Sequence, residues 1–256
     1  MNQRYQVVVV GGGVTGLMVA TLLAKGPQRD SLQITLVDAA ERPVFSPEDD
    51  VALRVSAIAN GTAELFARVG AWEYASATRV SPYDGMCVWD EDDSPDSDSA
   101  LRFSADEFAV PQLGFIVENV LLQDVLLYQL DRTDATLRFE SPIRSLRRGV
   151  RQYMLELESG DTLPADLVIG ADGALSVVRS AVGIESSEWP YDQTALVTHQ
   201  RPEKPHGSIS RQRFLRNGPL GILPLEDGRV SVVWSTTPAQ AKAALGADDA
   251  ATGRML

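Results

Sequence analysis

A glycine-rich turn directly after an apolar run is the feature that most limits how this chain can fold. The run Val7–Val10 is short, β-branched and uncharged, which is typical of a buried strand in a parallel sheet. The turn Gly11–Gly16 follows, and apolar residues at helical spacing continue to Lys25. Leu32–Asp38 then predicts a second strand. The order strand, turn, helix and strand predicts a βαβ unit with a ligand at its first turn.

The glycines of this turn fit the spacing G-x-G-x-x-G. In that pattern Gly11 permits the tight turn, Gly13 lets the backbone approach a pyrophosphate, and Gly16 allows close packing of helix on strand. The helix N-terminus supplies free N–H groups to phosphates. Asp38 follows about 20 residues later, where a carboxylate accepts hydrogen bonds from a ribose and disfavours the 2′-phosphate of NADP. The alternative is a glycine turn that occurs by chance. The flanking strand, the helix and the acidic residue all argue against it.

A second stretch, far along the chain, also predicts a buried strand followed by a glycine-containing turn and a helix. Leu167–Ile169 predicts another buried strand, and Asp172-Gly173 then turns into a helix that begins near Ser176. Asp172 would stand at the carboxyl end of a strand, where α/β sheets bind ligands. The alternatives are a solvated Asp-Gly turn and, for Arg179 on the same helix, simple pairing with a neighbouring acid.

Composition excludes several classes of function. The net charge of −12 over 256 residues argues against nucleic-acid binding and against broad adhesion to anionic lipid. Cys87 is the single cysteine, so a disulfide framework is excluded, and its apolar neighbours favour an inert thiol. No Cys, His or carboxylate cluster has metal-ligand spacing. The acidic segment Asp90–Asp98 is expected to be a solvated loop tip, because its spacing does not match a calcium loop.

The remaining pattern predicts two interleaved domains. Met86–Trp89 and Ala100–Phe103 form a predicted hairpin, and antiparallel strands follow Trp189. We assign 1–75 and 105–182 to the nucleotide-type domain, and 76–104 and 183–256 to an antiparallel-sheet domain. No run is apolar enough to span a bilayer, and the chain enters a strand almost at once, so a cytoplasmic location is expected.

The pattern Asp172-Gly173-x-x-Ser176-x-x-Arg179 resembles the Asp-Gly motif of FAD-dependent aromatic hydroxylases, the p-hydroxybenzoate hydroxylase-like class A flavoprotein monooxygenases. Within that class the chain is similar, from about residue 5 to residue 245, to the ubiquinone-biosynthesis hydroxylases, and most of all to their 2-polyprenylphenol branch. The segments that carry this likeness are Arg54–Ile58, Leu65–Trp72, Tyr83–Asp90, Gly114–Asn119, Leu223–Leu225 and Val232–Ser235.

The resemblance implies a fold, a cofactor and a reaction. The fold is α/β: a Rossmann-like FAD-binding domain interleaved with an antiparallel-sheet substrate domain. The reaction is hydroxylation of a polyprenylated phenol with FAD, O2 and NAD(P)H as electron donor. No catalytic side chain is assigned, because the flavin carries the chemistry. The implied FAD-binding residues are Gly11, Gly13, Gly16, Asp38, Arg54, Asn119, Gln123, Asp172 and Gly173, and the candidate substrate-wall residues are Phe214, Leu223 and Trp234.

For three of these positions a plainer interpretation stays open. Arg54 could be an exposed arginine before a helix, Asn119 a helix cap, and Gln123 a solvent-facing residue. The family also has a third FAD motif, Gly-Asp followed by Ala-Ala-His, which does not occur in this sequence. We therefore expect the N-terminal part of a hydroxylase, with weak FAD retention and a tendency to associate.

Other functions remain open at this point. One is a flavin enzyme of similar fold that acts on a soluble aromatic substrate. Another is a non-catalytic subunit of a ubiquinone-synthesis assembly. A homo-oligomer and a peripheral contact with the membrane of a bacterial cell are also compatible with the sequence. The ring carbon, the tail length and the electron donor are not determined by it.

Overall fold

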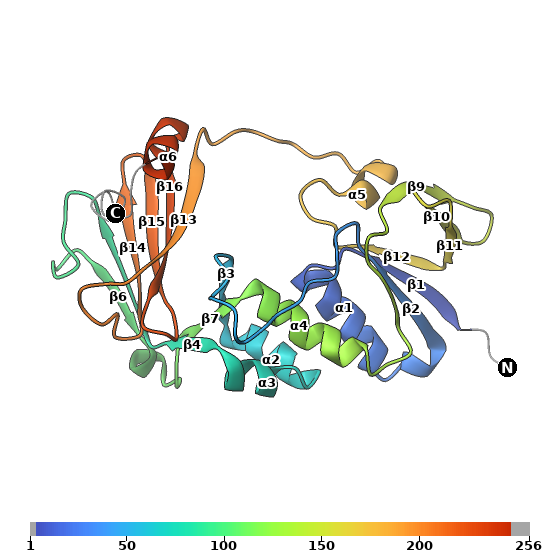
Figure 1. Cartoon of the computed structure of the whole chain (residues 1–256), viewed down its shortest axis with the longest axis horizontal. Helices are drawn as coiled ribbons and strands as arrows, with labels where there is room; N and C mark the ends of the chain where they lie inside the picture. Colours follow the sequence, from blue (N-terminus) through green and yellow to red (C-terminus); the bar gives the residue numbers. More distant parts are fainter. Residues whose placement is uncertain (1–3, 247–256) are drawn as a thin grey trace. The chain divides into compact units, whose positions relative to one another are not determined.

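The computed structural model describes residues 4–246, which form two compact units (Figure 1). Each unit is assembled from separate stretches of chain. The first runs to Asp49 and also contains Glu64–Ala75 and Val120–Ser187, and the second contains Asp50–Ala63, Ser76–Asn119 and the described chain from Glu188 onward.

A four-stranded parallel sheet is the centre of the first unit, with the strand order β12-β1-β2-β8. Val9 and Leu36 in its middle strands are fully buried. Helix α1 packs on β1 and β2, and its buried side includes Leu17 and Ala20. The strands are β1 (Tyr5–Val10), β2 (Leu32–Val37), β8 (Thr136–Arg138) and β12 (Leu167–Gly170), and the two long helices are α1 (Val14–Lys25) and α4 (Asn119–Leu130).

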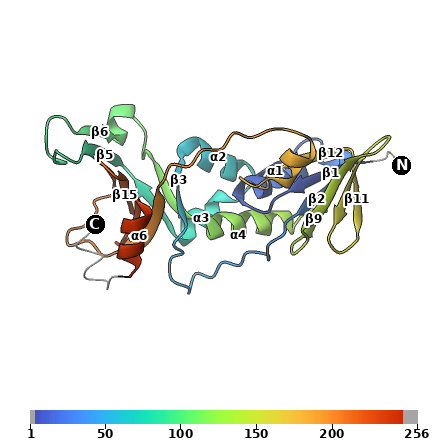
Figure 2. The same cartoon turned by 90° about the horizontal axis from the view of Figure 1, so that it is seen from above.

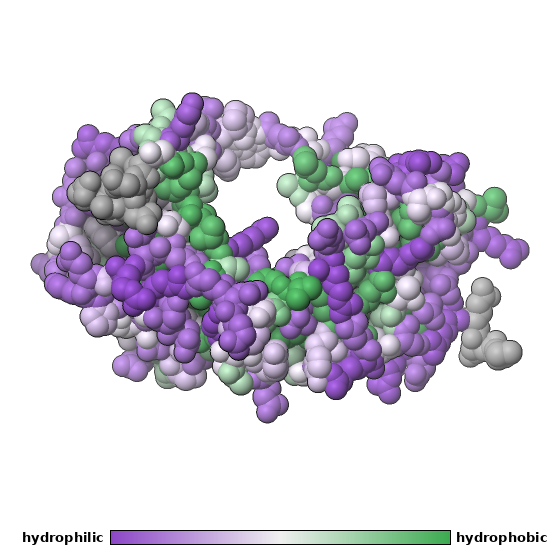
Figure 3. Space-filling model, viewed as in Figure 1, coloured by the Kyte–Doolittle hydropathy of each residue, from purple (hydrophilic) through white to green (hydrophobic). Residues whose placement is uncertain are grey.

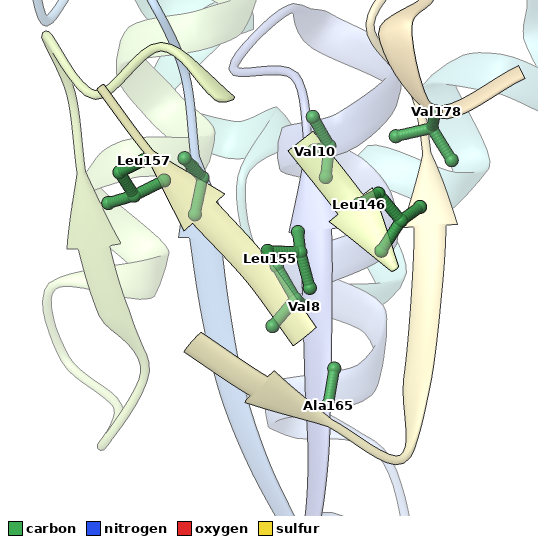
Figure 4. Close-up of a cluster of buried hydrophobic side chains, with 8 residues drawn as sticks. Val8, Val10, Leu146, Leu155, Leu157, Ala165 and Val178 are labelled. Atoms are coloured by element: carbon green, nitrogen blue, oxygen red, sulfur yellow. The ribbon is translucent and has the colours of Figure 1, made fainter. Parts of the chain in front are cut away.

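A three-stranded antiparallel sheet, β11-β10-β9, packs against the parallel sheet. Figure 4 shows the side chains of this contact, where Val8 and Val10 of β1 meet Leu155 and Leu146. A parallel sheet covered in this way has apolar side chains on both faces, which explains the unbroken valine run of β1. The elements here are β9 (Ile143–Arg148), β10 (Tyr153–Leu157), β11 (Thr162–Ala165) and α5 (Val177–Ala181).

Shorter helices complete the first unit and join it to the second. Helix α2 ends just before Gly70, whose φ of +75° suits glycine at the end of a helix. Phe66 and Trp72 make an edge-to-face contact with ring centroids 6.4 Å apart. These helices are α2 (Asn60–Arg68), α3 (Trp72–Thr78) and the 3-10 turn η1 (Arg29–Ser31).

The second unit holds two sheets, one of six strands (β13-β16-β15-β14-β5-β6) and one of three (β3-β7-β4). Its described helices are α6 (Pro238–Leu245) and the 3-10 turn η2 (Ala105–Phe108). The strands are β3 (Val55–Ala59), β4 (Val80–Tyr83), β5 (Gly85–Asp90), β6 (Leu101–Ser104), β7 (Gly114–Glu118), β13 (Thr194–Gln200), β14 (Ile209–Leu215), β15 (Gly218–Pro224) and β16 (Val230–Thr236).

The two faces of the six-stranded sheet differ. Trp234 pairs with Leu196 and Leu220 on the neighbouring strands, and together with Ala244 of α6 they form a buried cluster. Figure 2 shows α6 lying against this sheet. Leu223 pairs with Ser231, which lies three positions before Trp234 on the same strand. Because side chains alternate between the faces along a strand, Leu223 points to the face opposite Trp234.

Two features differ from the sequence-based expectation. The large sheet is mixed, because β14 pairs with β5 in parallel, and such a pair needs a long connection between its strands. The unit boundaries also differ: residues 50–63 and 105–119 lie in the second unit and 183–187 in the first. The reason is that β3, within 50–63, pairs with β7, within 105–119, so these two stretches are held together.

An ion pair between a half-buried arginine and an exposed aspartate in the second unit predicts one pH effect. Arg229 binds the carboxylate of Asp50 through both terminal nitrogens. The pKa of Asp50 falls from 3.8 to about 2, first because of this bond and then because of the N–H of Val51. The stabilisation is therefore complete above the unfolded pKa and is lost as the pH falls through about 2. An NMR titration should show this low pKa in the native chain and a return toward 3.8 in Arg229→Gln.

Asp166 provides the control for that titration. Its pKa is also lowered, but by the Gln6 N–H and the Gln152 side chain, so it should not respond to Arg229→Gln. An Asp50 pKa that is the same in both proteins would contradict the assignment.

Candidate functional site

A cleft of about 390 Å³ opens at the carboxyl ends of the parallel strands of the first unit. Both glycine-containing motifs contribute to its wall, although they are far apart in the sequence. Its lining residues are Val10, Gly11, Gly13, Val37, Asp38, Ala39, Ser141, Ile143, Ala171, Asp172, Gly173, Leu175 and Val177.

The register of the sheet brings the two motifs together. β1 and β12 are parallel neighbours, with Val10 beside Gly170. The N–H of Ala171 donates to the carbonyl of Val10 over 2.7 Å, and the N–H of Gly11 donates to Val37 over 2.8 Å. Because carboxyl ends of parallel strands share one edge, both turns leave the sheet at the same place.

The motif glycines meet different surroundings. Gly11 has a φ of +112°, and a Cβ there would lie 2.3 Å from the carbonyl oxygen of Ala171. A Cβ on Gly16 would lie 1.9 Å from the carbonyl oxygen of Gly11. A Cβ on Gly13 would meet no protein atom within 4 Å, and Gly13 lines the cleft. Gly11 and Gly16 are thus required by the fold, whereas Gly13 leaves open space beside the cleft.

The N-terminus of α1 stands at this open space. Gly13 is its N-cap residue and provides no side chain to cap the first turn. The free N–H groups of a first turn carry positive partial charge and bind phosphate oxygens. The open space that the absent side chain of Gly13 leaves, together with these N–H donors, fits the diphosphate of a dinucleotide such as FAD.

Asp38 lies at the end of β2 and lines the cleft. One carboxylate oxygen accepts a short hydrogen bond from the N–H of Gly12, and the other accepts from Ala40 over 2.6 Å. These bonds fix the carboxylate next to the glycine turn. Asp38 is half-buried, and its binding of a ribose stays a prediction.

Asp172 also lines the cleft, but its oxygens are occupied by the start of α5. They accept from the Ser176 hydroxyl over 2.5 Å and from the N–H groups of Val177 and Val178 over 2.7 and 3.1 Å. Ser176 caps the same helix through the N–H of Arg179. Asp172 therefore shapes the turn, and Gly173 follows it with a φ of +78°.

The Arg179 guanidinium donates to the carbonyl of Ala174 over 2.6 Å, and among residues 4–246 it pairs with no acid. Its bond closes the loop between Gly173 and α5.

Gln123 and Asn119 both belong to α4 but act in different units. The Gln123 side chain donates to the carbonyl of Gly12 over 3.0 Å and so braces the glycine turn. Asn119 belongs to the second unit, where its Oδ1 accepts from the Ser56 hydroxyl over 2.6 Å and its N–H donates to the carbonyl of Arg54 over 3.0 Å. Arg54 is exposed, and it is not among the lining residues of the cleft.

Two features, one in each unit, were not predicted from the sequence. Gly12 packs against Phe139, since a Cβ there would approach the ring to 2.9 Å. Glu118 is 3% exposed and binds Arg79 through contacts of 2.7 and 3.2 Å, and it accepts from the N–H of Ala52 over 2.7 Å. The buried Glu118 could have been recognised in the sequence, because it is a charged residue at the end of the apolar run of β7.

The three candidate substrate residues do not share one wall. Phe214 pairs with Pro219 and lies on the same face of the six-stranded sheet as Leu223. Trp234 is on the opposite face, in the cluster beneath α6.

The described residues contain neither a candidate membrane span nor a candidate metal cluster. Between residues 4 and 246, no helix combines the length and the apolar character needed to cross a membrane. In the same part of the chain, no group of three or more His, Cys, Asp or Glu side chains is arranged to hold a metal ion.

The chain is similar in sequence to curated proteins. The chain is 36% identical over 258 residues to the mitochondrial ubiquinone biosynthesis monooxygenase COQ6 of Xenopus tropicalis, which covers 96% of this chain and 54% of the relative. It is 34% identical over 240 residues to the 3-demethoxyubiquinol 3-hydroxylase of Escherichia coli, at 93% and 59% coverage. The chain thus spans a little over half the length of these relatives.

Solved structures share the fold. PqsL of Pseudomonas aeruginosa, in complex with 2-aminobenzoylacetate, matches with a TM-score of 0.76 at 20% identity, over 95% of this chain and 64% of that one. The p-nitrophenol 4-monooxygenase PnpA of Pseudomonas putida matches with a TM-score of 0.72 at 18% identity, over 99% and 61%. The model of the FAD binding domain matches residues 4–244. The chain therefore belongs to the FAD binding domain family.

Proposed function

We propose that this chain is the FAD-binding portion of a monooxygenase that hydroxylates a polyprenylated phenol in ubiquinone biosynthesis. The observation that carries the proposal is the cleft in which Gly13, the uncapped start of α1 and the Asp172 turn come together. The names of the curated relatives, which describe ubiquinone biosynthesis and 3-demethoxyubiquinol hydroxylation, supply the substrate class.

The residues of the cleft have separate tasks in this proposal. The first-turn N–H groups of α1 bind the diphosphate, and Asp38 accepts hydrogen bonds from the ribose. Gln123 holds the glycine turn through Gly12, while Asp172 holds the second turn against α5. FAD, when bound, supplies the redox chemistry that activates oxygen, with NADH or NADPH as the electron source. Arg54 also stays in the proposal as an FAD-binding residue, beside the flavin or its phosphates, on the strength of the family resemblance alone.

The substrate ring is proposed to lie on the sheet face that carries Phe214 and Leu223. Phe214 is 48% exposed there, and Leu223 is half-buried. Trp234 packs behind this face and supports it through the α6 cluster. A substrate with a polyprenyl tail requires the protein to work next to a membrane, which is compatible with a cytoplasmic protein.

Product analysis tests the substrate class. A protein that contains this chain together with the remaining length found in its curated relatives, supplied with FAD, NADH or NADPH, oxygen and a polyprenylated phenol, is expected to release the hydroxylated phenol, as read by mass spectrometry. A tail-free phenol is the comparison substrate and is expected to react more slowly, since it lacks the apolar contact of the tail.

Two outcomes would contradict different parts of the proposal. Faster turnover of the tail-free phenol would assign the protein to soluble aromatic substrates. Bound FAD without any hydroxylated product would leave the cofactor site intact and reject the reaction, which would favour a non-catalytic subunit of a ubiquinone-synthesis assembly.

A further inference from the structure

The outer strand of the six-stranded sheet has a free edge. Strand β6 pairs with β5 on one side and is the last strand of the sheet on the other. Its first three residues are all exposed. Edge strands offer unpaired N–H and C=O groups, which can pair with a strand from another chain.

Large apolar side chains project from this edge. Leu101 is 60% exposed and Phe103 is 41% exposed. They alternate with Arg102, so both lie on the face that also carries Val88 and Met86 of β5. Soluble surfaces rarely gather such residues at a free edge, and an apolar strip of this kind marks a contact site.

The loop before β6 carries an excess of negative charge, although the Arg102 guanidinium of β6 donates to its Pro95 and Ser97 carbonyls. Residues 90–98 contain six carboxylates and no lysine or arginine. Arg216 binds Glu91 and Asp92, and Asp93 accepts from Ser99. The carboxylates of Asp96 and Asp98 have no ion-pair partner within residues 4–246. Figure 3 shows a hydrophilic surface at the left-hand end, where Figure 1 places β6.

We propose that β6 binds an extended basic segment of a partner protein as an added strand. Backbone groups of β6 would pair with the segment, Leu101 and Phe103 would contact its apolar side chains, and Asp96 and Asp98 would bind its lysines or arginines. The negative loop disfavours an anionic membrane as occupant. A second copy of this chain is disfavoured because each copy carries a net charge of −12.

A synthetic peptide tests the proposal independently of FAD binding. Valine and threonine alternate in its middle, its ends are lysine-rich, and a matched peptide has glutamate-rich ends. Fluorescence anisotropy should show binding of the lysine-ended peptide only, with affinity that falls as salt rises. The amides of β6 should exchange more slowly with solvent in the complex.

One pair of single variants and one double variant locate the site. Leu101→Lys should weaken binding about tenfold, as expected for loss of a central apolar contact. Leu245→Lys is the matched control, because Leu245 is 73% exposed at the end of α6 in the same unit, and it should bind as the native chain does. The double variant Asp96→Asn, Asp98→Asn should weaken binding about threefold and flatten the salt dependence.

Several results would overturn this proposal. Equal binding of the lysine-ended and glutamate-ended peptides would reject the charge argument. Equal loss in Leu101→Lys and Leu245→Lys would reject the edge as the site. Self-association that Leu101→Lys abolishes, or binding to anionic phospholipid vesicles through Leu101, would assign the edge to a different occupant.

Discussion

Gly16→Ala is expected to destabilise the first unit strongly, whereas Gly13→Ala is expected to keep the fold and lose FAD. A Cβ on Gly16 would lie 1.9 Å from the carbonyl oxygen of Gly11, which is backbone and cannot rotate away. Such overpacking costs about 3 kcal/mol, and the better helix propensity of alanine returns about 1 kcal/mol. Urea denaturation should therefore show a net loss of about 2 kcal/mol in Gly16→Ala.

Gly13→Ala is the matched control for that loss. Its φ of −70° is allowed for alanine, and its Cβ would meet no protein atom within 4 Å. The free energy of unfolding should change by less than about 1 kcal/mol, since glycine and alanine differ modestly at an N-cap. The same Cβ would enter the space in which the diphosphate approaches the backbone, so FAD affinity should fall about tenfold or more. Equal FAD affinity in Gly13→Ala and the native chain would contradict the assignment of this turn.

Glu118→Ala is expected to produce the largest stability loss in the second unit. The change leaves the Arg79 guanidinium, whose side chain is 16% exposed, without this carboxylate, and the N–H of Ala52 also loses its acceptor. Removing one member of a buried ion pair costs about 3–5 kcal/mol. Urea denaturation measures this loss, and hydrogen exchange should show faster opening of residues 52–56.

The exposed ion pair between Arg216 and Asp92 serves as the comparison for the stability loss in Glu118→Ala. Both side chains are largely exposed, so Asp92→Ala should cost less than about 1 kcal/mol. Glu118→Gln should fall between the two, because the amide oxygen can still accept from Ala52. A loss in Glu118→Ala no larger than that in Asp92→Ala would show that the buried pair does not hold this unit together.

The sequence predicted the centre of the fold well because its signals there are local. The valine run, the glycine turn and the stop at Gly26 fix β1 and α1 without help from distant residues. The end of β12 was recognised in the same way, from an apolar run followed by Asp172-Gly173. Their meeting in one cleft also follows from sequence, since parallel strands end at one edge.

Features set by pairing between distant segments were not predictable in this way. The parallel pairing of β14 with β5 and the joining of β3 to β7 depend on tertiary register, which no local pattern contains. For the same reason Trp234 and Leu223 looked alike in the sequence but lie on opposite faces of the sheet. The buried Glu118 was hidden because a strand-end glutamate is exposed in most proteins, and only its contacts with Arg79 and Ala52 show otherwise.

Amide chemical-shift mapping of a FAD titration tests the central claim most directly. The largest shifts are expected on Gly11, Gly12 and Gly13 and on the turn from Ala171 to Gly173, and Gly13→Ala is expected to lose them. Shifts confined to other parts of the chain, or the same pattern in Gly13→Ala, would contradict the cleft as the FAD site.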